Sequence, residues 1–128
     1  MPRILLVEDE ENISLLYRIE LEAEGYDVLV ARDGKSAVQM ALEDEPDVVI
    51  MDINLPQKMD GLEAMSKIHG AGKSIPVIIN TGYSQYRDNF MSWAAEDYVV
   101  KSGDLSTLKE AITQVLGKGS DTEDSPDL

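Results

Sequence analysis

A chain of 128 residues fits one domain and leaves too little for a second folded one. The absence of cysteine excludes a disulfide scaffold and thiolate chemistry. The formal net charge of −14 argues against direct binding to nucleic acid or to an anionic membrane surface. No apolar run approaches the roughly 20 residues that span a bilayer, and the first residues do not resemble a signal peptide, so we expect a cytoplasmic protein.

Five short apolar runs predict five strands. The runs are continuous rather than alternating, and β-branched residues dominate three of them, which is typical of strands buried on both faces of a parallel sheet. In chain order they cover residues 4–7, 28–31, 48–51, 77–79 and 98–100.

The segments between and after these runs show helical spacing of their apolar residues. The five sets are Leu16, Ile19 and Ala23; Ala37, Met40 and Ala41; Leu62, Met65 and Ile68; Phe90, Trp93 and Ala94; and Leu105, Leu108, Ile112, Val115 and Leu116. The alternation predicts a three-layer, doubly wound (βα)5 fold with a parallel sheet over residues 1–117. Residues 118–128 are polar and acidic without an apolar period, so we expect a disordered tail there.

Polar residues that could form a site follow four of the five apolar runs, whereas the second run ends in Arg32 and Asp33, which lack a comparable role. Ligands of an open α/β sheet bind beyond the carboxyl ends of its strands, so these residues are the candidates for a site. They are Glu8 to Glu11 after the first run, Asp52 and Asn54 after the third, Asn80 and Thr81 after the fourth, and Lys101 after the fifth. Singly, each has an ordinary explanation as a helix N-terminal charge, a turn residue or a solvated side chain. Together they indicate a functional site.

These groups are suited to phosphoryl transfer. Carboxylates that converge at one edge repel each other unless a cation neutralises them, and Mg²⁺ prefers an all-oxygen site of this kind. Asp52 could then attack a phosphoryl group and form an aspartyl-phosphate. Lys101 could meet the developing negative charge, and the Thr81 hydroxyl could bond a phosphoryl oxygen.

The chain closely resembles the receiver domain of bacterial two-component response regulators, the family that includes the chemotaxis response regulator, over about residues 2–117. The matching motifs are ILLVEDE at 4–10, DINLP at 52–56, MDG at 59–61, TG at 81–82 and DYVVK at 97–101. The resemblance implies a flavodoxin-like sheet with strand order 2-1-3-4-5.

The resemblance also implies a phosphorylated Asp52 and a Mg²⁺ ion. Asp9 would ligate the ion directly together with Asp52, Glu8 would act through water, and Asn54 would contribute its backbone carbonyl. Asn54 and Tyr83 flank the phosphoryl position in this family and would tune hydrolysis of the aspartyl-phosphate.

Two further residues, Thr81 and Tyr98, would form the family's switch pair, with Tyr98 turning inward when Thr81 engages the phosphoryl group. The phosphoryl donor would be a sensor histidine kinase or a histidine phosphotransfer protein. We expect a stand-alone regulator, a monomer or weak dimer, that signals to a downstream protein through the fourth helix, fifth strand and fifth helix. It would be no enzyme beyond promoting its own phosphotransfer and dephosphorylation.

The sequence departs from the family pattern in three places. Gln57 and Lys58 both separate Pro56 from the MDG motif, where one residue is usual. Ser102 follows Lys101 in place of a proline in a cis peptide, and because a cis bond before another residue costs about 2.5 to 4 kcal/mol we predict a trans bond. The segment before the fifth strand has Ala94 and Ala95 where glycine is common, so the helix end must use a different cap.

Two other functions stay open at this point, and a third, a nucleotide binder, is excluded by the sign of its charge. A receiver that binds partners without phosphate turnover is compatible with Ser102 and the longer loop. A haloacid-dehalogenase-type phosphatase also uses an aspartate after a strand, but it needs a second acid where this chain has Asn54. A flavodoxin-like nucleotide binder needs phosphate-binding amides after the first strand, where Glu8 to Glu11 would repel phosphate.

Overall fold

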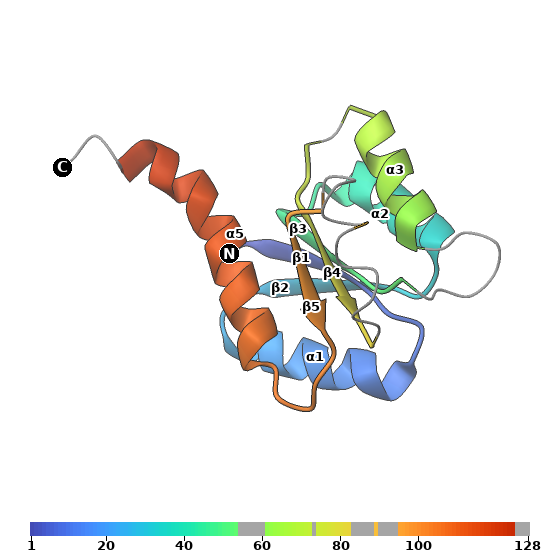
Figure 1. Ribbon diagram of the computed structural model, residues 1–128, viewed down its shortest axis with the longest axis horizontal. Coiled ribbons are helices and arrows are strands. Elements are labelled where there is room, and N and C mark those ends of the chain that lie inside the picture. Colours follow the sequence, from blue (N-terminus) through green and yellow to red (C-terminus); the bar gives the residue numbers. More distant parts are fainter. Residues whose placement is uncertain (54–60, 73, 83–88, 90–94, 125–128) are drawn as a thin grey trace.

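The computed structural model describes residues 1–53, 61–72, 74–82, 89 and 95–124 (Figure 1). In these ranges the chain alternates between strands and helices. The elements are β1 (Arg3–Val7), α1 (Glu11–Ala23), β2 (Asp27–Ala31), α2 (Gly34–Asp44), β3 (Val48–Met51), α3 (Gly61–Gly70), β4 (Val77–Thr81), β5 (Asp97–Val100) and α5 (Ser106–Asp124). The helix that the sequence predicts around Phe90 to Ala94 lies outside the described residues.

The five strands form one parallel sheet in the order β2-β1-β3-β4-β5, which confirms the predicted topology. The strand order reverses at β1, because the chain moves outward to β2 and then returns to place β3 on the other side. Val7, the last residue of β1, pairs with Ala31 of β2 and with Met51 of β3. Thr81 likewise pairs with Val100. The carboxyl ends of these strands therefore lie side by side at one edge of the sheet.

Both faces of the sheet are buried, as the continuous apolar runs predict. Successive residues of a strand point to opposite faces, so each strand contributes to two cores. Leu5, Val7, Val49 and Met51 pack beneath α2 and α3. The alternate residues of the same strands pack beneath α1 and α5, with helix residues such as Tyr17, Leu21 and Ile112. Figure 1 shows the two helical layers on opposite sides of the sheet.

Helix α1 buries a different face from the one its apolar spacing suggested. Ser14, Tyr17 and Leu21 face the sheet, whereas Leu16 is 47% exposed and Ile19 is 57% exposed. Both sets of residues are spaced by three and four positions, so the spacing predicts a helix without selecting its buried face. In α3 and α5 the predicted apolar residues are buried or partly buried.

The last helix extends beyond the point where we expected the folded chain to end. α5 continues through Gly117 to Asp124, so residues 118–124 have helical backbone instead of the disordered conformation expected for the tail. No proline interrupts this stretch before Pro126, and a glycine inside a helix costs only about 1 kcal/mol relative to alanine. Figure 1 shows the end of α5 projecting away from the sheet. The boundary of the domain at residue 117 stays a prediction.

Two further expectations concern the backbone and the membrane. All peptide bonds of the described residues are trans, which confirms the trans bond predicted between Lys101 and Ser102. Within the described ranges, no helix combines the length and apolar character needed to cross a bilayer.

The start of α3 lies against the end of β3 and requires glycine. The Gly61 amide donates a hydrogen bond to the carbonyl oxygen of Ile53 at 3.1 Å. A Cβ atom at position 61 would collide with the carbonyl oxygen of Asp52. The close approach of the two segments is therefore possible only without a side chain.

We predict that Gly61→Ala lowers the free energy of unfolding by about 1–3 kcal/mol, because either α3 or the residue 52 backbone must move to relieve the overlap. Urea unfolding measures the effect. Gly70→Ala is the matched control in the same helix, because a Cβ there meets no heavy atom within 4 Å. Equal stability of the two variants would contradict the packing argument.

Candidate functional site

An acidic cluster occupies the carboxyl edge of the sheet. Glu8 follows β1 and Asp52 follows β3, and the pairing of Val7 with Met51 makes these two residues neighbours. One carboxylate oxygen from each of Glu8, Asp9 and Asp52 lies within 4.8 Å of the others. Glu8 and Asp52 are buried, and Asp9 is exposed. The structure thus brings together the three acids that the sequence predicted as one site.

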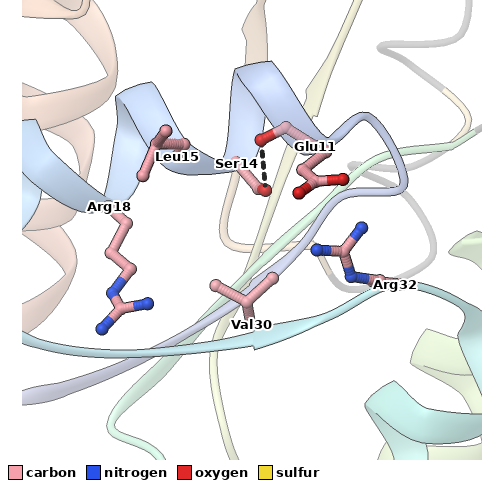
Figure 2. A pocket seen from close by; sticks show the side chains of 6 residues that line it. All are labelled: Glu11, Ser14, Leu15, Arg18, Val30 and Arg32. Atoms are coloured by element: carbon pink, nitrogen blue, oxygen red, sulfur yellow. Dashed lines mark hydrogen bonds between the residues drawn. The ribbon is translucent and has the colours of Figure 1, made fainter.

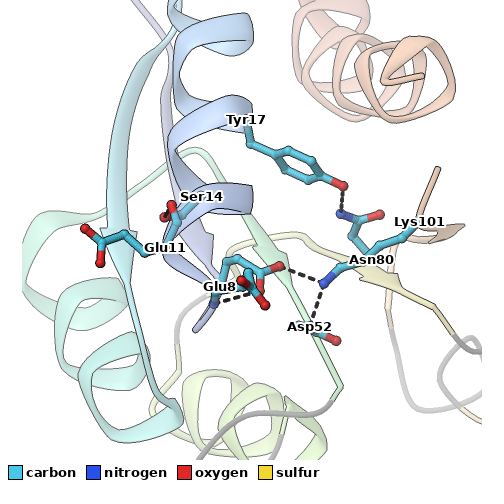
Figure 3. Close-up of polar contacts among 8 residues, drawn as sticks. Glu8, Glu11, Ser14, Tyr17, Asp52, Asn80 and Lys101 are labelled. Carbon is cyan, nitrogen blue, oxygen red and sulfur yellow. Dashed lines mark hydrogen bonds and ion pairs between the residues drawn. The ribbon is translucent and has the colours of Figure 1, made fainter. Parts of the chain in front are cut away.

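Lys101 bridges two of these acids (Figure 3). Its Nζ lies 2.7 Å from Oε1 of Glu8 and 2.8 Å from Oδ2 of Asp52. The lysine side chain is 22% exposed, against 3% for Glu8 and 10% for Asp52. An ammonium group has three N–H donors and no acceptor. Lys101 can therefore partly neutralise two carboxylates and still keep a donor for another group.

Burial and these ion pairs act on the proton affinities of the site. Burial raises the pKa of the Glu8 carboxyl, although hydrogen bonds from Lys101 and from the Glu10 amide oppose the rise. Burial by itself would lower the pKa of Lys101, but its hydrogen bonds to Asp52 and Glu8 outweigh that effect and raise it. Lys101 therefore stays protonated at neutral pH, as a cation fixed beside the acids.

The predicted switch residues lie on β4 and β5, the two strands that follow β3 in the sheet. Thr81 ends β4 with no exposed surface, and Tyr98 in β5 is 2% exposed. The amide of Lys101 donates to the carbonyl oxygen of Thr81 at 2.6 Å, which ties the lysine to the threonine strand. Tyr98 packs in the core beneath α2 and α3, so its ring is inward in this structure. Its movement with Thr81 stays a prediction.

Other candidate residues have different outcomes. Asn54 and Tyr83 lie outside the described residues, so their predicted roles are untested. Glu10 is the N-cap residue of α1 and Glu11 lies in its first turn, where negative charge is favourable. These two acids therefore have the helix-terminal positions that we considered for them.

Sequence reasoning missed a buried polar pair behind the acids. The Asn80 side-chain amide donates to the phenol oxygen of Tyr17 at 3.2 Å. Asn80 is 3% exposed and Tyr17 is 4% exposed. Asn80 was among the residues after the fourth apolar run without an assigned role. The one available signal was a polar residue at the end of an otherwise apolar strand.

A separate pocket of about 360 Å³ lies beside α1 and β2 (Figure 2). Glu11, Ser14, Leu15, Arg18, Val30 and Arg32 line it. The Ser14 hydroxyl donates to the Glu11 carbonyl oxygen within the helix, and Arg18 pairs with Glu22. None of the clustered acids lines this pocket, so it is distinct from the site at the sheet edge.

Comparisons with known proteins agree with the geometry. Residues 4–113 match the family described as the response regulator receiver domain. The response regulator ArlR of Staphylococcus saprophyticus is 36% identical over 118 residues, which cover 91% of this chain and 53% of ArlR. The chain thus spans about half the length of this curated relative.

Solved structures show the same resemblance. The response regulator TrrA of Thermotoga maritima, in complex with Mg²⁺-BeF, has a TM-score of 0.84 and 41% identity, with 90% of this chain and 99% of that chain covered. TrrA in complex with the histidine kinase ThkA has a TM-score of 0.82 and 41% identity, with coverage of 91% and 99%. The family match over most of the chain, together with these relatives, shows that the chain belongs to the response regulator receiver domains.

Proposed function

We propose that this domain accepts a phosphoryl group on Asp52, with Mg²⁺ bound at the acidic cluster, and signals by a change in shape. The single observation that carries the proposal is the position of Lys101, which holds Asp52 and Glu8 in one partly buried cluster. An ion pair that served only the stability of the fold would need one acid beside Lys101. Three acids and a lysine at the carboxyl edge of a parallel sheet are a combination suited to binding a cation and a phosphoryl group.

The acids present fit Mg²⁺. The cluster offers only oxygen ligands, and two of its three acids are buried, so their mutual repulsion is weakly screened by water. Glu8, Asp9 and Asp52 would hold the ion, and the backbone carbonyl of Asn54 is the further ligand that the family resemblance implies. When bound, Mg²⁺ would neutralise the acids and draw negative charge from the incoming phosphoryl group. TrrA, which was solved with Mg²⁺-BeF, supports this assignment.

The residues of the chain supply the transfer step. A carboxylate oxygen of Asp52 attacks the phosphorus of a phosphohistidine on the donor protein. An oxygen–phosphorus bond forms while the nitrogen–phosphorus bond breaks, and its electron pair stays on the histidine nitrogen. Lys101 then bonds a phosphoryl oxygen in place of Asp52, and the Thr81 hydroxyl donates to another. Asn54 and Tyr83 would set how fast water removes the group.

The donor and the target are also proposals. A histidine kinase is the favoured donor, because TrrA was solved in complex with ThkA, and a histidine phosphotransfer protein is the alternative. The downstream target would be a protein that binds at β5 and α5, together with the helix that the sequence predicts around Phe90 to Ala94. We expect the domain to act as a monomer or weak dimer in the cytoplasm.

We predict that wild-type protein incubated with Mg²⁺ and acetyl phosphate gains the mass of one phosphoryl group, located on Asp52 by peptide mass spectrometry. Asp52→Asn abolishes the gain, because an amide is too weak a nucleophile for phosphorus. The control is Asp44→Asn in α2, outside the acidic cluster. An unlabelled wild-type protein would favour a receiver that binds partners without phosphate turnover.

We predict opposite effects of Lys101→Met on the two ligands. Mg²⁺ affinity, measured by calorimetry, does not fall, because the variant removes a cation that competes for Glu8 and Asp52. The rate of phosphorylation by acetyl phosphate falls about 100-fold, because the charge of the incoming group loses its partner.

Lys109→Met is the control for Lys101→Met. Lys109 pairs with Glu20 of α1 and with Glu24, the C-cap residue of that helix, away from the acidic cluster. Loss of Mg²⁺ binding in Lys101→Met, with phosphorylation unchanged, would contradict the assigned role of the lysine.

A further inference from the structure

We propose that Tyr17 and Asn80 are a positioning pair for the acceptor site, which fixes the end of β4, and with it Thr81, against α1. The inference rests on the proposed function, because it assigns a role in that reaction to two residues outside the acidic cluster. The family motifs that identify the chain include neither residue.

The pair is a polar contact within an apolar layer. Tyr17 packs in the core beneath α1 and α5, among residues such as Ile50 and Ile78. A carboxamide removed from water needs a hydrogen-bond partner, and the described structure gives Asn80 the Tyr17 hydroxyl at 3.2 Å. The bond therefore restricts where β4 can lie relative to α1 in a way that apolar packing alone would not.

The pleat of the sheet places Asn80 on the same face as Glu8, Asp52 and Lys101. Ile4 and Leu6 of β1, Val48 and Ile50 of β3, Ile78 of β4 and Val99 of β5 all pack in the layer beneath α1 and α5. Continuing the alternation by two residues in each strand reaches Glu8, Asp52, Asn80 and Lys101. Asn80 pairs in register with Val99, two residues before Lys101. Asn80 therefore lies directly behind the lysine and the acids, as Figure 3 shows for the labelled side chains.

The position of Asn80 in the chain links it to the phosphoryl-binding group. Thr81 is the next residue, and its carbonyl oxygen accepts the hydrogen bond from the Lys101 amide at 2.6 Å. A shift of Asn80 would thus move both groups that we assign to the phosphoryl oxygens. It would leave Glu8 and Asp9 in place, because these follow β1. The pair is expected to influence phosphoryl binding and to spare Mg²⁺ binding.

A set of three variants tests the pair. Tyr17→Phe removes the hydroxyl alone, Asn80→Leu replaces the amide with an apolar group of similar size, and the double variant removes both polar groups. Tyr26→Phe is the matched control, since Tyr26 packs partly buried against the same core and lies outside the pair. Each protein is titrated with Mg²⁺ alone, then with beryllofluoride in saturating Mg²⁺ as a mimic of the phosphoryl group, and its thermal unfolding is measured.

We expect beryllofluoride affinity to fall at least about fivefold in both single variants and in the double variant, which is the low end of usual coupling between sites. Mg²⁺ affinity should stay within about twofold of wild type. The double variant should recover the thermal stability that the single variants lose, because removing both partners of a buried hydrogen bond leaves no unsatisfied group. If the double variant recovers thermal stability but not beryllofluoride affinity, the pair positions the site and does more than stabilise the fold.

Beryllofluoride affinity that is unchanged in the variants, or that recovers with stability in the double variant, would overturn the positioning role while leaving the proposed function intact. A wild-type protein that binds Mg²⁺ but neither beryllofluoride nor a phosphoryl group would instead refute the proposed function, and this inference with it.

Discussion

The structure depends on one electrostatic constraint, the placement of three carboxylates within 4.8 Å of one another at the edge of a buried sheet. Such groups repel strongly where water cannot screen them. Lys101 offsets part of this repulsion because it forms ion pairs with both Glu8 and Asp52. Removing one partner from a buried ion pair costs more than the pair contributes, because it leaves a charge uncompensated. One ammonium beside three acids leaves net negative charge, and that residual charge is what makes a divalent cation a suitable ligand.

The fold supplies the rigid frame that keeps these charges together. The register of β1 against β3 makes Glu8 and Asp52 neighbours, and β5 delivers Lys101 beside the end of β4. Gly61 lets α3 start against the backbone of Asp52. Tyr17 and Asn80 tie the opposite layer to β4. Asp52 is thus supported from both faces of the sheet.

Much of this arrangement could be predicted from the sequence, because the relevant signals are local. Continuous apolar runs predict buried parallel strands, and in such a sheet polar residues that follow the strands must gather at one edge. The buried face of α1 could not be predicted, because Leu16 and Ile19 have the same helical spacing as Tyr17 and Leu21. The bond between Tyr17 and Asn80 spans 63 positions, and no local pattern encodes it. The pairing of Lys101 with Glu8 likewise depends on side-chain geometry across the four strands from β1 to β5. The extent of α5 differed from expectation because polar composition does not exclude a helix.

The most direct test of the account is a Mg²⁺ titration of the wild-type domain followed by two-dimensional NMR. If the acids and the lysine form one site, the backbone amide resonances of Glu8, Asp9, Asp52 and Lys101 shift together with a single dissociation constant. Addition of beryllofluoride then moves Thr81 and Asn80. Resonances that titrate independently, or that do not respond to Mg²⁺, would contradict the claim that these residues form one cation and phosphoryl site.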